Sequence, residues 1–179
     1  FFFSSRRRHT RSSTVSGSEM CIRDRQRAID SGLAVTYIAT AEAGDGEMAE
    51  RIAHHQRRRP ADWLLVEEPL HLARVLSEQA SPERCIIVDC LTLWLSNLLA
   101  DEPIDEIHFA AELTGLLEVL PRLPGQLLLV SNEVGLGIIP LGAMTRRFCD
   151  ESGRLHQALA ASCDRVTFVT AGLPMTLKG

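Results

Sequence analysis

Lysine is almost absent from this chain of 179 residues. Among its 19 basic residues, Lys178 is the one lysine, and the others are arginine. A site that depends on a lysine side chain is therefore excluded everywhere except at the C-terminal end. This exclusion matters most for phosphate binding, because the phosphate loops of many nucleotide-binding proteins carry an essential lysine.

Other absences narrow the class of protein. The five cysteines form no CxxC pair, so neither zinc spacing nor a disulfide framework is indicated. No apolar run reaches the ~18 residues of a membrane-spanning helix; the most apolar region, "CIIVDCLTLWLSNLLA", is interrupted by Asp89. The formal net charge is −4, whereas general nucleic-acid binders are usually basic. We therefore expect a cytoplasmic protein with no membrane span and no nucleic-acid partner.

The first 25 residues differ from the rest of the chain. They are rich in serine and arginine, with six arginines against two acidic residues, and show neither helical nor strand periodicity. They resemble the translated adapter sequence that contaminates some environmental sequence assemblies; a natural basic tail is the alternative. We expect residues 1–25 to be a non-native or disordered segment. Since 45% of the chain is apolar, residues 26–179 have enough core for one domain.

From Gln26 onward, short apolar runs alternate with segments of helical spacing. The apolar runs predict strands over 33–39, 85–90, 126–132 and 164–172. Helical spacing predicts helices over 45–58, 69–80, about 92–100, about 105–120 and about 142–162. Strands that are apolar along their whole length and alternate with helices favour an α/β fold with a mainly parallel sheet flanked by helices.

In such a sheet, ligands bind at the carboxyl ends of the strands. The residues at those ends, which outline the candidate site, are Thr40, Asp89, Asn132 with Glu133, and Ala171 with Gly172. "IIVDC" has the form of a Walker-B strand, whose aspartate holds Mg²⁺ beside nucleotide phosphates. The alternative is that Asp89 caps the helix that follows.

The loop "SNEVGLGIIP", residues 131–140, follows the third of these strands. Gly135 and Gly137 allow a ligand to approach the backbone closely. Pro140 stands where the third glycine of GxGxxG would be, so this is not a dinucleotide-binding fingerprint. By itself the pattern indicates a turn more often than a site.

Two adjacent histidines stand in "RIAHHQRRRP", residues 51–60. At about 100° per residue, His55 shares the apolar face of its helix with Ile52, whereas His54 points away from it. Arg51 and Arg58 lie about one turn on either side of His55. A partly desolvated, neutral histidine among arginines suits a nucleophile that attacks phosphorus. The alternative, which the local pattern alone favours, is a core histidine under a solvated basic helix.

A nucleotide-binding sheet with a Walker-B strand should also contain a first strand followed by GxxxxGK[ST]. No such pattern occurs in the chain, and residues 26–32 resemble the end of the helix that should follow it. We therefore expect the first strand and the phosphate loop to be absent, with residues 1–25 in their place. The neighbouring strand would then be left unpaired, which is an aggregation liability.

Four segments together resemble the bifunctional adenosylcobinamide kinase / adenosylcobinamide-phosphate guanylyltransferase family of cobalamin biosynthesis. They are "YIATAEAGDGEMAERIAHHQRRRPADWLLVEEP", "IIVDCLTLWLSNLL", "LLLVSNEVGLGIIP" and "RRFCDESGRLHQALA", in the family's order and spacing, from about Gly32 to Lys178. The resemblance implies a RecA-like P-loop NTPase fold that is usually assembled as a homotrimer. It also implies two reactions. ATP or GTP phosphorylates adenosylcobinamide, and GTP then guanylylates an enzyme histidine that passes GMP to adenosylcobinamide phosphate, giving adenosylcobinamide-GDP.

The resemblance also assigns residues. The histidine nucleophile in the family's RIxxH pattern falls on His55, with His54 as the second choice. Nucleotide contacts fall on Ala39, Thr40, Ala41, Gln56, Arg57, Arg58, Arg59, Glu67 and Asp89. Asp89 is expected to hold Mg²⁺, directly or through water.

The missing phosphate loop lowers the activity that we expect of this chain. Because that loop holds the nucleotide phosphates, we expect this chain to be weakly active or inactive, above all in the kinase step. One alternative is a guanylyltransferase without kinase activity, and another is a non-catalytic nucleotide-binding protein. A third is an arginine-rich nucleic-acid arm on an acidic domain, whose binding would be sensitive to salt.

Overall fold

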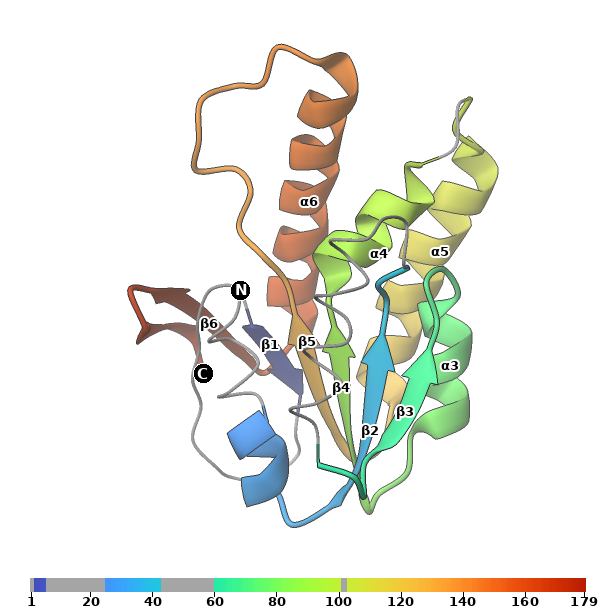
Figure 1. The fold of residues 1–179 in the computed structure, drawn as a ribbon, viewed down its shortest axis with the longest axis vertical. Helices are drawn as coiled ribbons and strands as arrows, with labels where there is room; N and C mark the ends of the chain where they lie inside the picture. The colour runs from blue at the N-terminus through green and yellow to red at the C-terminus, as the bar shows by residue number, and fades with distance from the viewer. Residues whose placement is uncertain (1, 6–24, 43–59, 101–102) are drawn as a thin grey trace.

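The computed structural model describes residues 2–5, 25–42, 60–100 and 103–179. Within them, seven strands form a sheet in the order β3-β2-β4-β5-β1-β6-β7 (Figure 1). The strands are β1 Phe2–Ser5, β2 Ala34–Ala39, β3 Leu64–Glu67, β4 Arg84–Asp89, β5 Gln126–Val130, β6 Arg165–Thr170 and β7 Leu173–Lys178.

The strands that form the centre of the sheet run parallel. β2 pairs in parallel with both β3 and β4, and β4 pairs in parallel with β5. β1 is antiparallel to β5 and to β6, so β5 and β6 point the same way. β7 returns antiparallel along β6. The predicted α/β class with a mainly parallel sheet is confirmed.

Residues at the start of the chain fill the place between β5 and β6. Phe2 lies opposite Val130 on one side and Thr167 on the other. The expectation of an unpaired neighbouring strand is therefore wrong, because β1 pairs with the backbones of both strands. Sequence analysis misses β1 because the serine- and arginine-rich composition of residues 1–25 hides four strand-forming residues. The wider assignment of residues 1–25 as a non-native or disordered segment stays a prediction.

Four helices of the described chain cover one face of the sheet: α3 Leu72–Gln79, α4 Leu91–Leu98, α5 Glu106–Val119 and α6 Ala143–Ser162. The short 3₁₀ helix η1, Leu120–Arg122, follows α5. Ile38 and Val88 belong to the core on this face, whereas Tyr37 and Ile87 belong to the core on the other face. The alternation follows from the two-residue period of a strand. Helical residues 25–30 contribute Ala28 to that second core.

The observed elements match most of the predicted ones. Four predicted strands correspond to β2, β4, β5 and β6, and four predicted helices to α3 to α6. The predicted helix over 45–58 lies outside the described residues. β3 and β7 are missed because β3 has four residues and β7 is exposed throughout and contains Pro174. Both flank the sheet as edge strands, where apolar patterning is weak and proline is tolerated.

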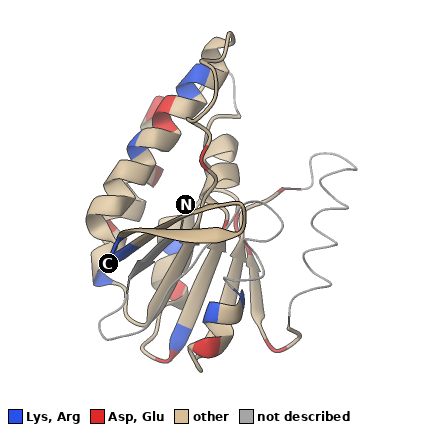
Figure 2. Cartoon of the chain, turned by 90° about the vertical axis from the view of Figure 1, so that its left-hand side faces the viewer, with Lys and Arg blue, Asp and Glu red and all other residues tan. Residues whose placement is uncertain are grey.

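The two halves of α6 have different environments. Its charged residues stand between Arg146 and Arg154, and Figure 2 shows them on the part of the helix that extends away from the sheet. The second half has no charged residue from Leu155 onward, and Leu155, His156 and Leu159 are buried there. His156 is thus placed against the sheet by its apolar neighbours. Among the described residues, no helix is long and apolar enough to cross a membrane.

Candidate functional site

Three strand ends meet at one edge of the sheet. Ala39, the last residue of β2, is in register with Glu67 of β3 on one side and with Asp89 of β4 on the other. The Thr40 amide donates to the Asp89 carbonyl oxygen at 3.1 Å, and Ala41 follows, half-buried. The structure therefore brings together all of the predicted nucleotide-contact residues that it describes.

Thr40 ties the end of β2 to the residue that follows β4. Its side chain is fully buried. The Thr40 hydroxyl donates to the Cys90 carbonyl oxygen at 2.7 Å and accepts from the Cys90 amide at 2.9 Å. The Thr40 carbonyl oxygen accepts from Asn97 Nδ2 of α4 at 2.8 Å. These bonds fix the strand ends relative to each other, and the Thr40 hydroxyl is used within the protein.

Asp89 is half-buried at the end of β4, and its carboxylate accepts a hydrogen bond from the Tyr37 hydroxyl. Sequence analysis does not select Tyr37. The two-residue strand period puts Tyr37 on the same face as Ala39, and the parallel register places that face beside Asp89. The N-cap of α4 is Cys90, the residue after Asp89. The oxygen-only carboxylate fits the ligand preference of Mg²⁺.

A second group of polar side chains follows β5. Ser131 is buried, and its hydroxyl lies 3.3 Å from Thr92 Oγ1 and 2.7 Å from His156 Nε2. The Asn132 amide donates to Thr92 Oγ1 at 2.7 Å, and Asn132 Nδ2 lies 3.2 Å from the same oxygen. Since Thr92 stands in the first turn of α4, directly after Asp89 and Cys90, these bonds join the end of β5 to the end of β4.

His156 is neutral in this network. Burial lowers the pKa of His156 to about 4. Glu133 Oε2 lies 3.9 Å from His156 Nδ1, but with an uncharged imidazole this contact is not an ion pair. Sequence analysis misses both Ser131 and His156, because they are 25 residues apart and a lone histidine on a helix carries no signal.

Stability should fall by about 3 kcal/mol through His156 alone between pH 7 and pH 4. The folded-state pKa of about 4 lies below the ordinary value of 6.5, so the unfolded chain takes up the proton first as the pH falls. The stabilisation is complete above pH 6.5 and is lost as the pH approaches 4. Urea unfolding at pH 7, 5.5 and 4 measures it. In a His156→Gln chain, the free energy of unfolding should fall less between pH 7 and pH 4. An equal fall in both chains would contradict the lowered pKa of His156.

The loop from Asn132 to Pro140 leaves the site at its edge. At its start, Glu133 Oε1 accepts from the exposed Gly135 amide at 2.6 Å. A Cβ at Gly135 would lie only 2.9 Å from that oxygen, so the glycine permits the close approach. Beyond it, Leu136 and Ile138 are exposed. The start of the loop is thus joined to the site through Asn132, and the role of the rest of the loop stays a prediction.

The fourth predicted strand end has a different role. Ala171 and Gly172 have φ values of 49° and 75° and form the two-residue turn between β6 and β7. Positive φ at both central residues is what a type I′ hairpin turn requires. The end of β6 lies at the same edge of the sheet as the end of β5 but is separated from it by β1, and the part of Ala171 and Gly172 in the site stays a prediction.

The remaining predicted residues lie outside the described part of the chain. They are His55, its alternative His54, and Gln56, Arg57, Arg58 and Arg59. Their position relative to Asp89 stays a prediction.

Comparison with known proteins gives consistent matches over most of the chain. The profile of the family described as cobinamide kinase / cobinamide phosphate guanyltransferase matches residues 23–177. A Pseudomonas aeruginosa protein named bifunctional adenosylcobalamin biosynthesis protein CobP is 59% identical over 152 residues, covering 85% of this chain and 87% of that protein. The bifunctional adenosylcobalamin biosynthesis protein CobU of Escherichia coli is 36% identical over 155 residues, covering 80% and 86%. The protein of the same name from Salmonella typhimurium is also 36% identical.

Proposed function

Because the chain belongs to the cobinamide kinase / cobinamide phosphate guanyltransferase family, we propose that it acts in cobalamin biosynthesis by two successive transfers. In the first, ATP or GTP phosphorylates adenosylcobinamide. In the second, GMP moves from GTP to adenosylcobinamide phosphate and gives adenosylcobinamide-GDP. The observation that supports this most directly is the alignment of Ala39, Glu67 and Asp89 at the carboxyl edge of a parallel sheet.

The proposed second reaction proceeds through the histidine. The neutral His55 imidazole attacks the α-phosphorus of GTP, so a P–N bond forms while the P–O bond to pyrophosphate breaks. A phosphate oxygen of adenosylcobinamide phosphate then attacks the same phosphorus, and the P–N bond breaks. Arg57, Arg58 and Arg59 would pair with phosphate oxygens. Asp89 would hold Mg²⁺, which neutralises charge on the phosphates when it is bound.

The first reaction is expected to be weak in a chain of these 179 residues. No GxxxxGK[ST] pattern occurs in them, so the amides and lysine that would hold the phosphates are not supplied. Each charge-assisted hydrogen bond lost corresponds to about 1.5–3 kcal/mol. A guanylyltransferase without kinase activity is the alternative, and it would label His55 without phosphorylating adenosylcobinamide. We propose a cytoplasmic homotrimer as the working form.

Asp89→Asn should lower the rate of adenosylcobinamide-GDP formation by about 100-fold, since a phosphate-bound metal ion supplies several kcal/mol of transition-state stabilisation. The assay mixes chain, Mg²⁺, GTP and adenosylcobinamide phosphate, and separates the corrinoid products. Asp62→Asn is the matched control. Asp62 is exposed and lies just before β3, where the parallel strands begin, whereas Asp89 lies where they end.

The same assay is run on a chain in which a strand and a GxxxxGK[ST] loop replace residues 1–24. If neither folded chain forms adenosylcobinamide-GDP, the proposed function is wrong. If Asp89→Asn and Asp62→Asn retain equal activity, the role of Asp89 is wrong while the function stands.

A further inference from the structure

Two histidines and a glutamate converge where α3 meets α5. His71 is the N-cap of α3, and His108 and Glu112 stand on α5. One potential metal-binding atom from each of the three lies within 4.8 Å of the others. His71 Nδ1 is 2.8 Å from Glu112 Oε1, and the His71 and His108 rings meet edge to face with centroids 5.6 Å apart. We propose that these three side chains form a binding site for one divalent transition-metal ion of the zinc or cobalt type.

The fold holds the α5 side of this cluster in place. His108 and Glu112 are four residues apart and therefore share one face of the helix. Asp105 caps α5, its carboxylate accepting from the Ile107 amide at 3.1 Å and the His108 amide at 3.0 Å. The first turn of α5, which carries His108, is thus fixed from its start.

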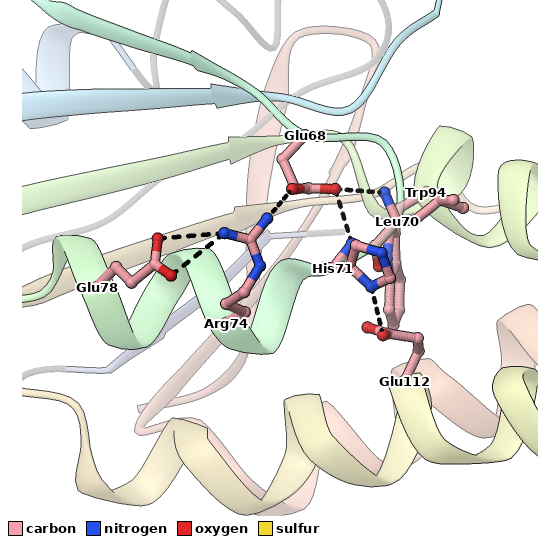
Figure 3. A network of polar contacts seen from close by, with 7 residues as sticks. All are labelled: Glu68, Leu70, His71, Arg74, Glu78, Trp94 and Glu112. Carbon is pink, nitrogen blue, oxygen red and sulfur yellow. Dashed lines mark hydrogen bonds and ion pairs between the residues drawn. The ribbon is translucent and has the colours of Figure 1, made fainter.

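The turn that carries His71 is held by a network of its own (Figure 3). Glu68 Oε1 accepts from the His71 amide at 2.9 Å and from the Leu70 amide at 3.1 Å. Glu68 Oε2 pairs with Arg74 at 2.6 Å. On the other side, Trp94 Nε1 donates to the Leu70 carbonyl oxygen at 2.7 Å.

The two helices also approach each other closely beside the cluster. Gly115 of α5 faces Ala73 of α3, and a Cβ at Gly115 would lie 3.4 Å from the Ala73 Cβ. Hydrogen bonds and this close packing thus fix the backbones that carry the three side chains, whose donor atoms already lie within 4.8 Å of one another. Small rotations of the three side chains are therefore enough to bring their donor atoms onto one ion.

The donor set decides which metal fits. Two imidazole nitrogens and one carboxylate oxygen suit Zn²⁺ and Co²⁺, whereas Mg²⁺ prefers oxygen ligands throughout. The Glu112 side chain is 14% exposed and that of His71 is 47% exposed, so one side of the cluster is open to a water ligand. The cluster shares no residue with the proposed Mg²⁺ site at Asp89, and it does not rest on the proposed function. The ion would clamp the start of α3 to α5.

The test is titration of the metal-free full chain with Co²⁺, read by its visible absorption, and with Zn²⁺, read by calorimetry and by Tm. We expect one ion bound per chain, a higher Tm with the metal, and no displacement by excess Mg²⁺. His71→Ala, His108→Ala and Glu112→Gln should each weaken binding at least about tenfold and remove the rise in Tm. Glu118→Gln, an exposed change on the same helix, should leave both unchanged.

The same data decide against the proposal in two ways. No binding by the unaltered chain means that His71 and Glu112 form only the hydrogen bond between them. Equal binding by all variants means that the metal binds elsewhere, such as at Cys149 or at histidines outside the described residues. Glu112→Gln keeps the size of the side chain, and circular dichroism of each variant shows that it is folded, so lost binding is not mistaken for unfolding.

Discussion

Replacing His55 with alanine should abolish the covalent GMP label that the chain acquires from GTP. The proposed nucleophile is a nitrogen of the His55 imidazole, which forms the P–N bond, and alanine has no nucleophilic atom in its side chain. The measurement incubates the chain with Mg²⁺ and GTP labelled at the α-phosphate, then counts protein-bound label after denaturation. A phosphoramidate is labile in acid and stable in base, so the label should disappear in acid and persist in base.

His54→Ala is the matched control, because it removes a neighbouring imidazole from the same segment. It should retain the label, since the helix predicted from the sequence would place His54 off the apolar face expected to carry His55. Loss of the label in His54→Ala and its retention in His55→Ala would reverse the assignment. If a folded, unaltered chain takes no label, the chain with an added GxxxxGK[ST] loop is tested in the same way. A label on that chain means that the unaltered chain binds GTP poorly, and no label means that the nucleophile is wrongly assigned.

The fold of the central sheet is predictable because its signals are local. β2 and β4 are buried on both faces, so their sequences are continuous apolar runs that end in Ala39 and Asp89. A parallel arrangement of such strands then places their ends together without knowledge of any contact. β3 and β7 give weak signals because edge strands need fewer apolar residues. β1 fills a place that only the completed sheet defines.

The polar network of the site is predictable only in part. Asp89 is visible because it ends an apolar strand, whereas the pairing of Ser131 with His156 joins residues from a strand end and a helix. The cluster of His71, His108 and Glu112 is similar, since His71 and Glu112 are 41 residues apart. Such contacts depend on how the helices pack on the sheet, and no single residue in the sequence indicates that packing. Sequence analysis therefore identifies groups at strand ends and misses their partners on helices.

Trp94→Ala should destabilise the chain by about 3–5 kcal/mol, the usual cost of emptying a buried aromatic position. Trp94 is fully buried in the core between the sheet and the helices. A loss of this size is a large part of the total stability of about 5–15 kcal/mol typical of a domain. Urea unfolding followed by circular dichroism measures it, and the fluorescence of the second tryptophan, Trp63, reports independently from the other face of the sheet.

Trp94→Phe separates the packing contribution from the hydrogen bond. Phenylalanine keeps most of the buried ring but cannot donate to the Leu70 carbonyl oxygen, so about 1–3 kcal/mol should be lost. Leu136→Ala, at a position 78% exposed, should change stability by less than about 0.5 kcal/mol. Because Leu70 precedes His71, the phenylalanine chain should also bind Zn²⁺ more weakly than the unaltered chain. A phenylalanine chain as stable as the original would mean that the bond to Leu70 contributes nothing, and that packing alone holds this turn against α4.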